Sequence, residues 1–100
     1  MITFKIDSCI NLENIYNYLE ILNNVYPVGF IGNFANNLHR YKNMNTLLCI
    51  NVFDRENIVG YLIVYRFNDK NMFEIQILNK YSGMKYGTHL LNIAKFHFDE

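Results

Sequence analysis

A turn rich in glycine and lysine lies near the end of the chain, between an apolar run that ends at Leu78 and an apolar-periodic segment that begins near Lys85. A strand, a turn and a helix start in this order leave the first backbone N–H groups of the helix unpaired, where they bind anions such as phosphate. Gly83 and Gly87 allow a positive φ or a close approach of the backbone to a ligand, and Lys80 and Lys85 add positive charge. The turn therefore predicts a cradle for an anionic ligand, with an ordinary strand-to-helix turn as the alternative.

Hydrophobic periodicity predicts the elements that position this turn. Ile2, Phe4 and Ile6 alternate with polar residues, as in a half-buried strand. Asn11 is a suitable N-cap for a helix, and Pro27 is expected to end that helix because it forces its predecessor out of the α region. The expected elements are a strand at 1–6, helices at 12–24 and 33–42, strands at 46–53, 58–65 and 72–78, and a final helix at 85–98.

Short polar turns separate the last three strands, so these strands are expected to form an antiparallel meander. The final helix places Leu90, Leu91, Ala94 and Phe98 at i, i+1, i+4 and i+8, which predicts that all four face inward.

Length, composition and charge limit the class of protein. One hundred residues make one domain, and a hydrophobic content of 51% with 16% aromatic residues predicts a packed globule. The formal net charge of zero argues against nucleic acid or an anionic membrane as a partner. No apolar stretch approaches the roughly 20 residues that span a bilayer, and no signal-peptide pattern is present. The expected location is cytoplasmic, and the frequent Asn indicates an AT-rich genome, such as that of a virus or phage.

Two cysteines, Cys9 and Cys49, lie far apart, with no CxxC pattern and no histidine at metal-ligand spacing. Both are expected to be small buried hydrophobic residues rather than disulfide partners or zinc ligands. The sequence thus predicts no metal site.

The turn and its flanks resemble the acetyl-CoA-binding motif of the GNAT N-acetyltransferase superfamily, whose usual form is V-x-P-x-Y-R-G-K-G-I-G-T-x-L-L. The run 86–92 is especially similar to the histone acetyltransferase branch. In the core pattern Q/R-x-x-G-x-G/A, the sequence departs at Ser82 and at Lys85, where the family has a glycine. The matching residues are Ile77, Tyr81, Gly83, Gly87, Thr88, Leu90 and Leu91.

The resemblance also includes the run 56–62, which is similar to the I-V-G-Y-L segment of the third strand in that family. It implies an α/β fold of the α+β type, with a mixed, mostly antiparallel sheet in the order β-α-α-β-β-β-α. Residues 1–100 would form a single GNAT-like domain that is truncated, with the N-terminal two thirds of the fold and without the usual C-terminal strand, helix and hairpin.

The same resemblance implies an acetyl-CoA-dependent N-acetyltransferase that acts on an amine acceptor. Main-chain groups near the end of the fourth strand would pair with the pantetheine as an added strand does, and the turn amides would bind the pyrophosphate. The residues implied to bind acetyl-CoA are Ile77, Leu78, Ser82, Gly83, Met84, Lys85, Tyr86, Gly87 and Thr88.

Acetylation of an amine needs a base that removes a proton from the ammonium. Glu74 is the only carboxylate inside the predicted fourth strand and is the first candidate, although a structural carboxylate is the alternative. The histone acetyltransferase branch carries its glutamate at the position of Asn71, and Asp69 is a weaker candidate on a turn. The three histidines are expected to be structural or surface residues: His39, His89 and His97.

The acceptor cannot be assigned from the sequence. Aromatic residues on or after the first helices line the acceptor groove in the family, although core packing is their alternative role: Tyr16, Tyr18, Tyr26 and Phe30. A second function also stays open, that of a catalytically inactive GNAT-like viral or phage protein that binds a host partner through the exposed edge of the fourth strand. A homodimer is a further possibility.

Overall fold

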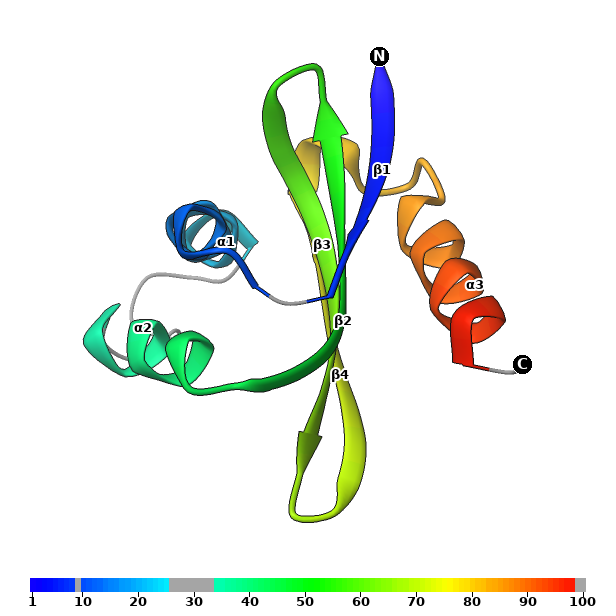
Figure 1. The fold of residues 1–100 in the computed structure, drawn as a ribbon. Coiled ribbons are helices and arrows are strands. Elements are labelled where there is room, and N and C mark those ends of the chain that lie inside the picture. Colours follow the sequence, from blue (N-terminus) through cyan, green and yellow to red (C-terminus); the bar gives the residue numbers. More distant parts are fainter. Residues whose placement is uncertain (9, 26–33, 99–100) are drawn as a thin grey trace.

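The computed structural model describes residues 1–8, 10–25 and 34–98, and it forms one four-stranded sheet in the order β1-β2-β3-β4 (Figure 1). Each strand and helix expected from the sequence is present, with bounds that differ by at most two residues. The expected helix break at Pro27, together with Cys9, Tyr26 and Phe30, lies outside the described residues. In chain order the elements are β1 (Ile2–Asp7), α1 (Leu12–Val25), α2 (Phe34–Lys42), β2 (Asn45–Asp54), β3 (Asn57–Phe67), β4 (Lys70–Ile77), the 3-10 helix η1 (Asn79–Tyr81) and α3 (Tyr86–Phe98).

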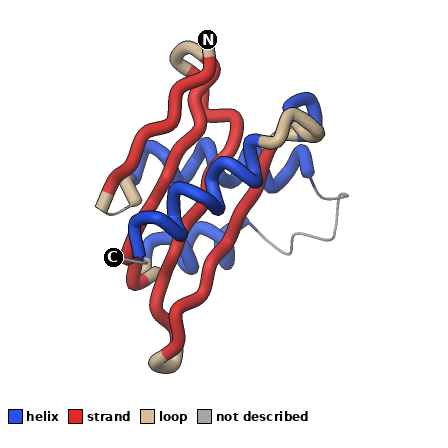
Figure 2. The backbone as a smooth tube through the Cα atoms, turned by 90° about the vertical axis from the view of Figure 1, so that its right-hand side faces the viewer, coloured by secondary structure: helices blue, strands red, loops and turns tan. Residues whose placement is uncertain are grey.

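The helices cover both faces of the sheet. α1 and α2 lie on one face and α3 lies on the other (Figure 1), where it runs obliquely across the strands (Figure 2). All strand pairings within the described ranges are antiparallel. The expected α+β class and mostly antiparallel sheet are therefore confirmed. None of the helices in the described part of the chain is long and apolar enough to cross a bilayer.

The start of α1 follows from one side chain. The Glu13 N–H donates to Oδ1 of Asn11 (2.9 Å), and the Asn14 N–H donates to the carbonyl oxygen of Asn11 (2.9 Å). Because these two bonds satisfy N–H groups that a helix start otherwise leaves open, the predicted N-cap at Asn11 is confirmed.

The junction of β3 with the end of β4 depends on a glycine. Gly60 pairs with Ile77, and a Cβ on Gly60 would lie only 2.5 Å from Cδ1 of Ile77. A larger residue would force the Ile77 side chain to another rotamer and would crowd the carbonyl oxygen of Gln76, which would lie 3.1 Å from the added Cβ. The Leu78 N–H then closes the ladder by donating to the carbonyl oxygen of Val59 (2.9 Å).

Three tyrosines form the centre of the core between α1, α2 and the sheet. Tyr18, Tyr41 and Tyr61 are each at most 2% exposed, and the rings of Tyr18 and Tyr61 lie 4.1 Å apart between centroids. The Tyr18 hydroxyl donates to Oδ1 of the buried Asn51 (2.5 Å) and lies 3.0 Å from Sγ of Cys49. Cys49 is fully buried, as expected.

These tyrosines predict how the protein behaves at high pH. Burial is the main cause that raises the pKa of Tyr18, Tyr41 and Tyr61 above the usual value near 10. A raised pKa in the folded state stabilises the fold fully below about pH 10, and this stabilisation is lost as the pH rises further. We expect three of the eight tyrosines to ionise only in the step in which helical circular dichroism is lost. Absorbance at 295 nm followed in parallel measures this, and gradual ionisation of all eight in a folded chain would contradict it.

Candidate functional site

The turn after β4 brings most of the predicted binding residues to one concavity of about 360 Å³. Leu78 and Met84 are the exceptions: Leu78 packs against both core clusters, and Met84 is exposed. Tyr81 lines the concavity although it was not among the predicted binding residues; its match to the family motif was the available signal. The lining residues are Ile77, Tyr81, Ser82, Gly83, Lys85, Tyr86, Gly87 and Thr88.

The start of α3 presents free donors to this concavity. The first hydrogen bond that closes the helix runs from the His89 N–H to the carbonyl oxygen of Lys85 (3.1 Å). The N–H groups of Tyr86, Gly87 and Thr88 precede it and have no acceptor among the described residues. The Ser82 N–H, in contrast, donates to the carbonyl oxygen of Asn79 (3.1 Å). The N–H groups of Gly83, Met84 and Lys85 have no acceptor among the described residues either, so the free amides extend over 83–88 and those at 86–88 belong to the helix start.

Backbone conformation shapes the turn. Gly83 has φ 83° and Lys85 has φ 65°, both in the left-handed region. A residue with a Cβ adopts this region at a cost of roughly 1–2 kcal/mol, so the position of Lys85 is one where glycine would be less strained. The Lys85 side chain is exposed, and it does not fill the concavity that it helps to line.

A carboxylate on a distant hairpin holds the turn in place. The Tyr81 hydroxyl donates to Oδ2 of Asp54 (2.5 Å), and the ammonium of Met1 lies 3.3 Å from Oδ1 of the same residue. The hydrogen bond from Tyr81 and the N-terminal charge lower the pKa of Asp54. The Asp54 carboxylate therefore stays charged at neutral pH and ties the turn to the β2–β3 hairpin.

The outer edge of β4 is a second feature of the site. The Leu78 N–H donates toward β3. In an antiparallel pair, every second residue directs its N–H and C=O to the partner strand and the residues between direct theirs away from it. The main-chain groups of Ile77, Ile75 and Phe73 therefore point away from β3, to the unpaired edge of β4. No strand pairs with this edge within the described residues. The carbonyl oxygen of Leu78 accepts from the Tyr81 N–H (2.8 Å). Ile77 thus presents its main chain outward, and Leu78 uses its own within the protein.

The side chain of Glu74 points to the face of the sheet that α2 covers, opposite to the face under α3. There it lies among hydrogen-bond donors. Nη1 of Arg40 lies 2.6 Å from Oε1 of Glu74. The hydroxyls of Tyr41 and Tyr61 donate to Oε2, the second at 3.1 Å. The side chain of Glu74 is 14% exposed. Neither Arg40 nor Tyr41 belongs to a motif of the sequence, so the sequence did not indicate them as neighbours of Glu74.

The remaining candidate bases lie elsewhere. Asp69 has φ 62° in the β3–β4 turn, at the end of β4 opposite to Ile77. His89 is exposed, and its ring lies 4.4 Å from that of Phe4 between centroids. Nδ1 of His39 accepts a hydrogen bond from the side-chain amide of Asn43 (3.2 Å). The described residues contain no group of His, Cys, Asp and Glu that would hold a metal ion.

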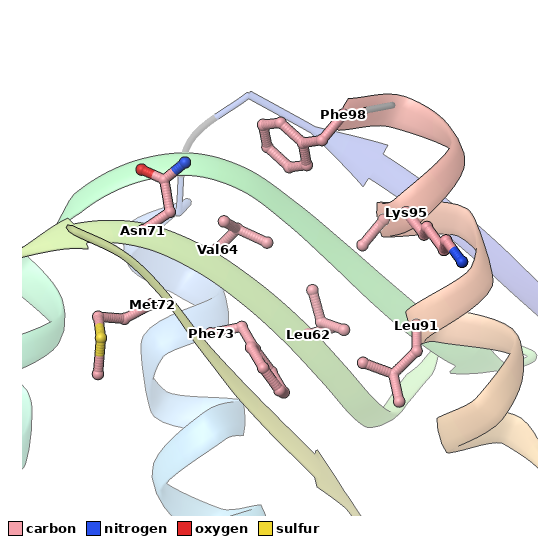
Figure 3. A pocket seen from close by; sticks show the side chains of 9 residues that line it. Leu62, Val64, Asn71, Met72, Phe73, Leu91, Lys95 and Phe98 are labelled. Carbon is pink, nitrogen blue, oxygen red and sulfur yellow. The ribbon is translucent and has the colours of Figure 1, made fainter. Parts of the chain in front are cut away.

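An apolar groove of about 280 Å³ lies between β4 and α3. Phe73 from β4, and Leu91 and Phe98 from α3, line it over Leu62 and Val64 (Figure 3). Leu90 and Ala94 face inward as expected, but the prediction for the other two helix positions is wrong, since Leu91 is 43% and Phe98 45% exposed. The reason is that β4 is the last described strand on this side, so the flank of α3 above it has no neighbour to pack against.

No family model matches this sequence, and no curated protein matches it either. Solved structures do. A PaiA N-acetyltransferase from Thermoplasma acidophilum in complex with coenzyme A superposes with a TM-score of 0.67 at 14% identity, over 95% of this chain and 71% of that one. A GNAT family acetyltransferase from Streptococcus pneumoniae gives 0.65 at 19% identity, over 100% and 70%. An aminoglycoside acetyltransferase from a soil metagenome in complex with sisomicin gives 0.61 at 14%, over 98% and 70%. The chain therefore has the fold of the GNAT acetyltransferases.

Proposed function

We propose that this chain binds acetyl-CoA at the turn between β4 and α3 and transfers the acetyl group to an amine. The observation that carries the proposal is the set of free N–H groups of Tyr86, Gly87 and Thr88 at a concavity, in a fold shared with an acetyltransferase that was crystallised with coenzyme A. Three converging N–H groups at a helix start bind a phosphate well, because the helix dipole adds to the hydrogen bonds.

The pyrophosphate is the part of acetyl-CoA that the turn accommodates in this proposal. The N–H groups at 86–88 donate to its oxygens, and Gly83 lets the backbone turn without a side chain at φ 83°. Lys80 and Lys85 supply the balancing positive charge. A net charge of zero over the whole chain means that this attraction is local to the turn.

The pantetheine arm pairs with the outer edge of β4. Ile77 and Ile75 offer the outward main-chain groups, two residues apart, that an added extended chain needs. Ile75 takes the place that the sequence resemblance gave to Leu78, whose N–H is already bonded to Val59. An N–H on this edge also stabilises the negative charge that develops on the thioester oxygen during attack.

Glu74 is the candidate base. In the reaction the amine nitrogen forms a bond to the thioester carbon, the carbon–sulfur bond breaks, and CoA leaves as the thiolate, which takes up the proton that the acylated nitrogen releases. The ammonium must first lose a proton. Three donors occupy Glu74, and an ionised carboxylate has about four acceptor positions, so one position is left for the amine or a bridging water.

Binding of acetyl-CoA tests the proposal directly. At a concentration of 100 times Kd, a ligand that binds only the folded state stabilises it by about 2.7 kcal/mol, which raises Tm by roughly 10 °C or more in a domain of this size. We expect this shift with acetyl-CoA and with CoA, and a much smaller one with pantetheine, which lacks the pyrophosphate. A Tm that millimolar acetyl-CoA leaves unchanged would refute the proposal.

A further inference from the structure

The apolar groove between β4 and α3 has no role in the proposed function. Its floor is formed by the buried side chains of Leu62 and Val64, and its walls by Phe73, Leu91 and Phe98 (Figure 3). The three wall residues are 59%, 43% and 45% exposed, respectively. Large apolar side chains that stay exposed around one hollow are typical of a binding site for an apolar group.

The unpaired edge of β4 leads from the cofactor turn to this groove. Ile77 lines the concavity proposed for the pyrophosphate, and its main chain points to the same edge as those of Ile75 and Phe73. From Ile77 to Phe73 the strand spans about 13 Å. The pantetheine arm has about as many bonds as four residues of extended main chain, and so about the same length. An arm that starts beside Ile77 therefore brings its sulfur atom beside Phe73.

The two faces of the sheet differ in polarity at this point. Neighbouring residues of a strand direct their side chains to opposite faces. The Glu74 side chain lies among polar groups under α2, where Arg40 contacts it, and the Phe73 side chain lines the apolar groove under α3 (Figure 3). An acyl group on the sulfur atom thus has the candidate base on one side and the groove on the other.

We propose that the groove binds the acyl group of the CoA thioester, and that the preferred donor carries a straight acyl chain of roughly six to ten carbons. This inference rests on the proposed function, because it uses the CoA site at the turn, and it specifies the acyl donor. The chemistry is unchanged: the acyl carbon passes from sulfur to the amine nitrogen, and the amine approaches from the side of Glu74.

The size of the groove sets the chain length. At about 30 Å³ for each small group of atoms, a volume of about 280 Å³ holds roughly nine carbons. The wall from Leu91 to Phe98 is about 10 Å long at the rise of an α-helix, which is the length of roughly eight bonds of an extended chain. An acetyl group would leave most of this space empty.

A series of donors tests the chain length. Complete burial of one methylene strengthens binding about fourfold, and we expect about half of that effect because the groove is open on one side. Octanoyl-CoA should therefore bind at least about 50-fold more tightly than acetyl-CoA in calorimetry below its micelle concentration. Palmitoyl-CoA should gain little over decanoyl-CoA, because the groove is then full. Equal Kd values for acetyl-CoA and octanoyl-CoA would overturn the inference and leave the CoA site standing.

Two matched variants of α3 test the position of the chain. Leu91→Asn places a polar group in the groove wall, and we expect the preference for octanoyl-CoA over acetyl-CoA to fall about tenfold. Phe96→Asn is the control, because Phe96 lies on the same helix, is 76% exposed and does not line the groove. It should keep the preference. An unchanged preference in Leu91→Asn, or an equal loss in both variants, would overturn the inference.

Thioesters without phosphate separate this inference from the proposed function. S-octanoyl-N-acetylcysteamine and S-acetyl-N-acetylcysteamine do not depend on the turn for binding, and their effect on the methyl resonances of Leu62, Val64 and Leu91 is followed by NMR. Shifts with the octanoyl compound that are weaker in Leu91→Asn support the acyl groove, even if CoA fails to bind the turn. No shifts, or equal shifts with both compounds, overturn it.

Discussion

Replacing Gly87 by glutamate is expected to abolish the thermal shift that acetyl-CoA produces, without weakening the free protein. A Cβ at this position meets only Cδ1 of Ile75, at 3.8 Å, an ordinary contact. An acidic side chain in the first turn of α3 also favours the helix by about 0.3–1 kcal/mol, and loss of a helical glycine adds roughly 0.5–1 kcal/mol. The variant should therefore fold and melt at least as high as the wild type.

The same carboxylate would stand beside the N–H groups at 86–88, where the pyrophosphate is proposed to bind. At about 4 Å and an effective dielectric constant near 20, two like charges repel by about 4 kcal/mol. We therefore expect the Kd of acetyl-CoA to rise about 100-fold or more, measured by calorimetry and by Tm.

Gly87→Gln is the matched control, since it has the same size and no charge. Because the two side chains fill the same space beside the concavity, the comparison isolates the charge, and Gly87→Gln should keep more of the acetyl-CoA shift than Gly87→Glu. If Gly87→Glu binds acetyl-CoA as tightly as Gly87→Gln does, the anion is held elsewhere and the assignment of the turn is wrong.

Glu74→Gln is expected to lower both stability and the rate of transfer, by separate physical causes. The change removes the charge that Arg40, Tyr41 and Tyr61 contact. Hydrogen bonds to a charged group contribute about 1.5–3 kcal/mol, and Arg40 can regain water because its side chain is 40% exposed. We expect a loss of about 1–3 kcal/mol in the free energy of unfolding, measured by urea denaturation.

The rate of acetyl transfer by Glu74→Gln should fall further than its loss of stability explains. Removal of a general base costs about 100- to 10,000-fold in rate, and we expect kcat per folded molecule to fall in this range well below Tm. Tyr41→Phe is the control, because it deletes one donor to Glu74 and keeps the carboxylate. It should lose about 1.5–3 kcal/mol in the free energy of unfolding, since it deletes a hydrogen bond to a charged group, and should lose little activity. Equal losses of kcat in the two variants would mean that Glu74 only supports α2.

Much of the fold follows from local patterns. The polar turns 54–57 and 68–71 separate apolar runs, so the three strands of the meander could be predicted from neighbours in the chain. Asn11 caps α1 in the structure as its side chain predicts. The turn at 82–88 could also be predicted from neighbouring residues, because its two glycines and the first apolar positions of the last helix lie within ten residues of one another. Its similarity to the histone acetyltransferase branch stays a prediction.

The tertiary structure determined which main-chain groups already form hydrogen bonds, which apolar side chains are covered, and which of both stay exposed. Leu78 and Ile77 are equivalent in a sequence pattern, but the register of β3 turns the main chain of Ile77 outward and that of Leu78 inward. Likewise, Leu91 and Leu90 are both apolar positions of α3, yet only Leu90 is covered, since the sheet ends at β4.

The sequence by itself determined the order of elements and the position of the glycine-containing turn between β4 and α3, because both arise from residues a few positions apart. Only the tertiary structure brought Glu74 to Arg40, which lies 34 residues earlier in the chain, and Tyr81 to Asp54. Contacts at such separations depend on strand register and helix docking, which result from packing of the whole core and leave no periodic signal in the chain.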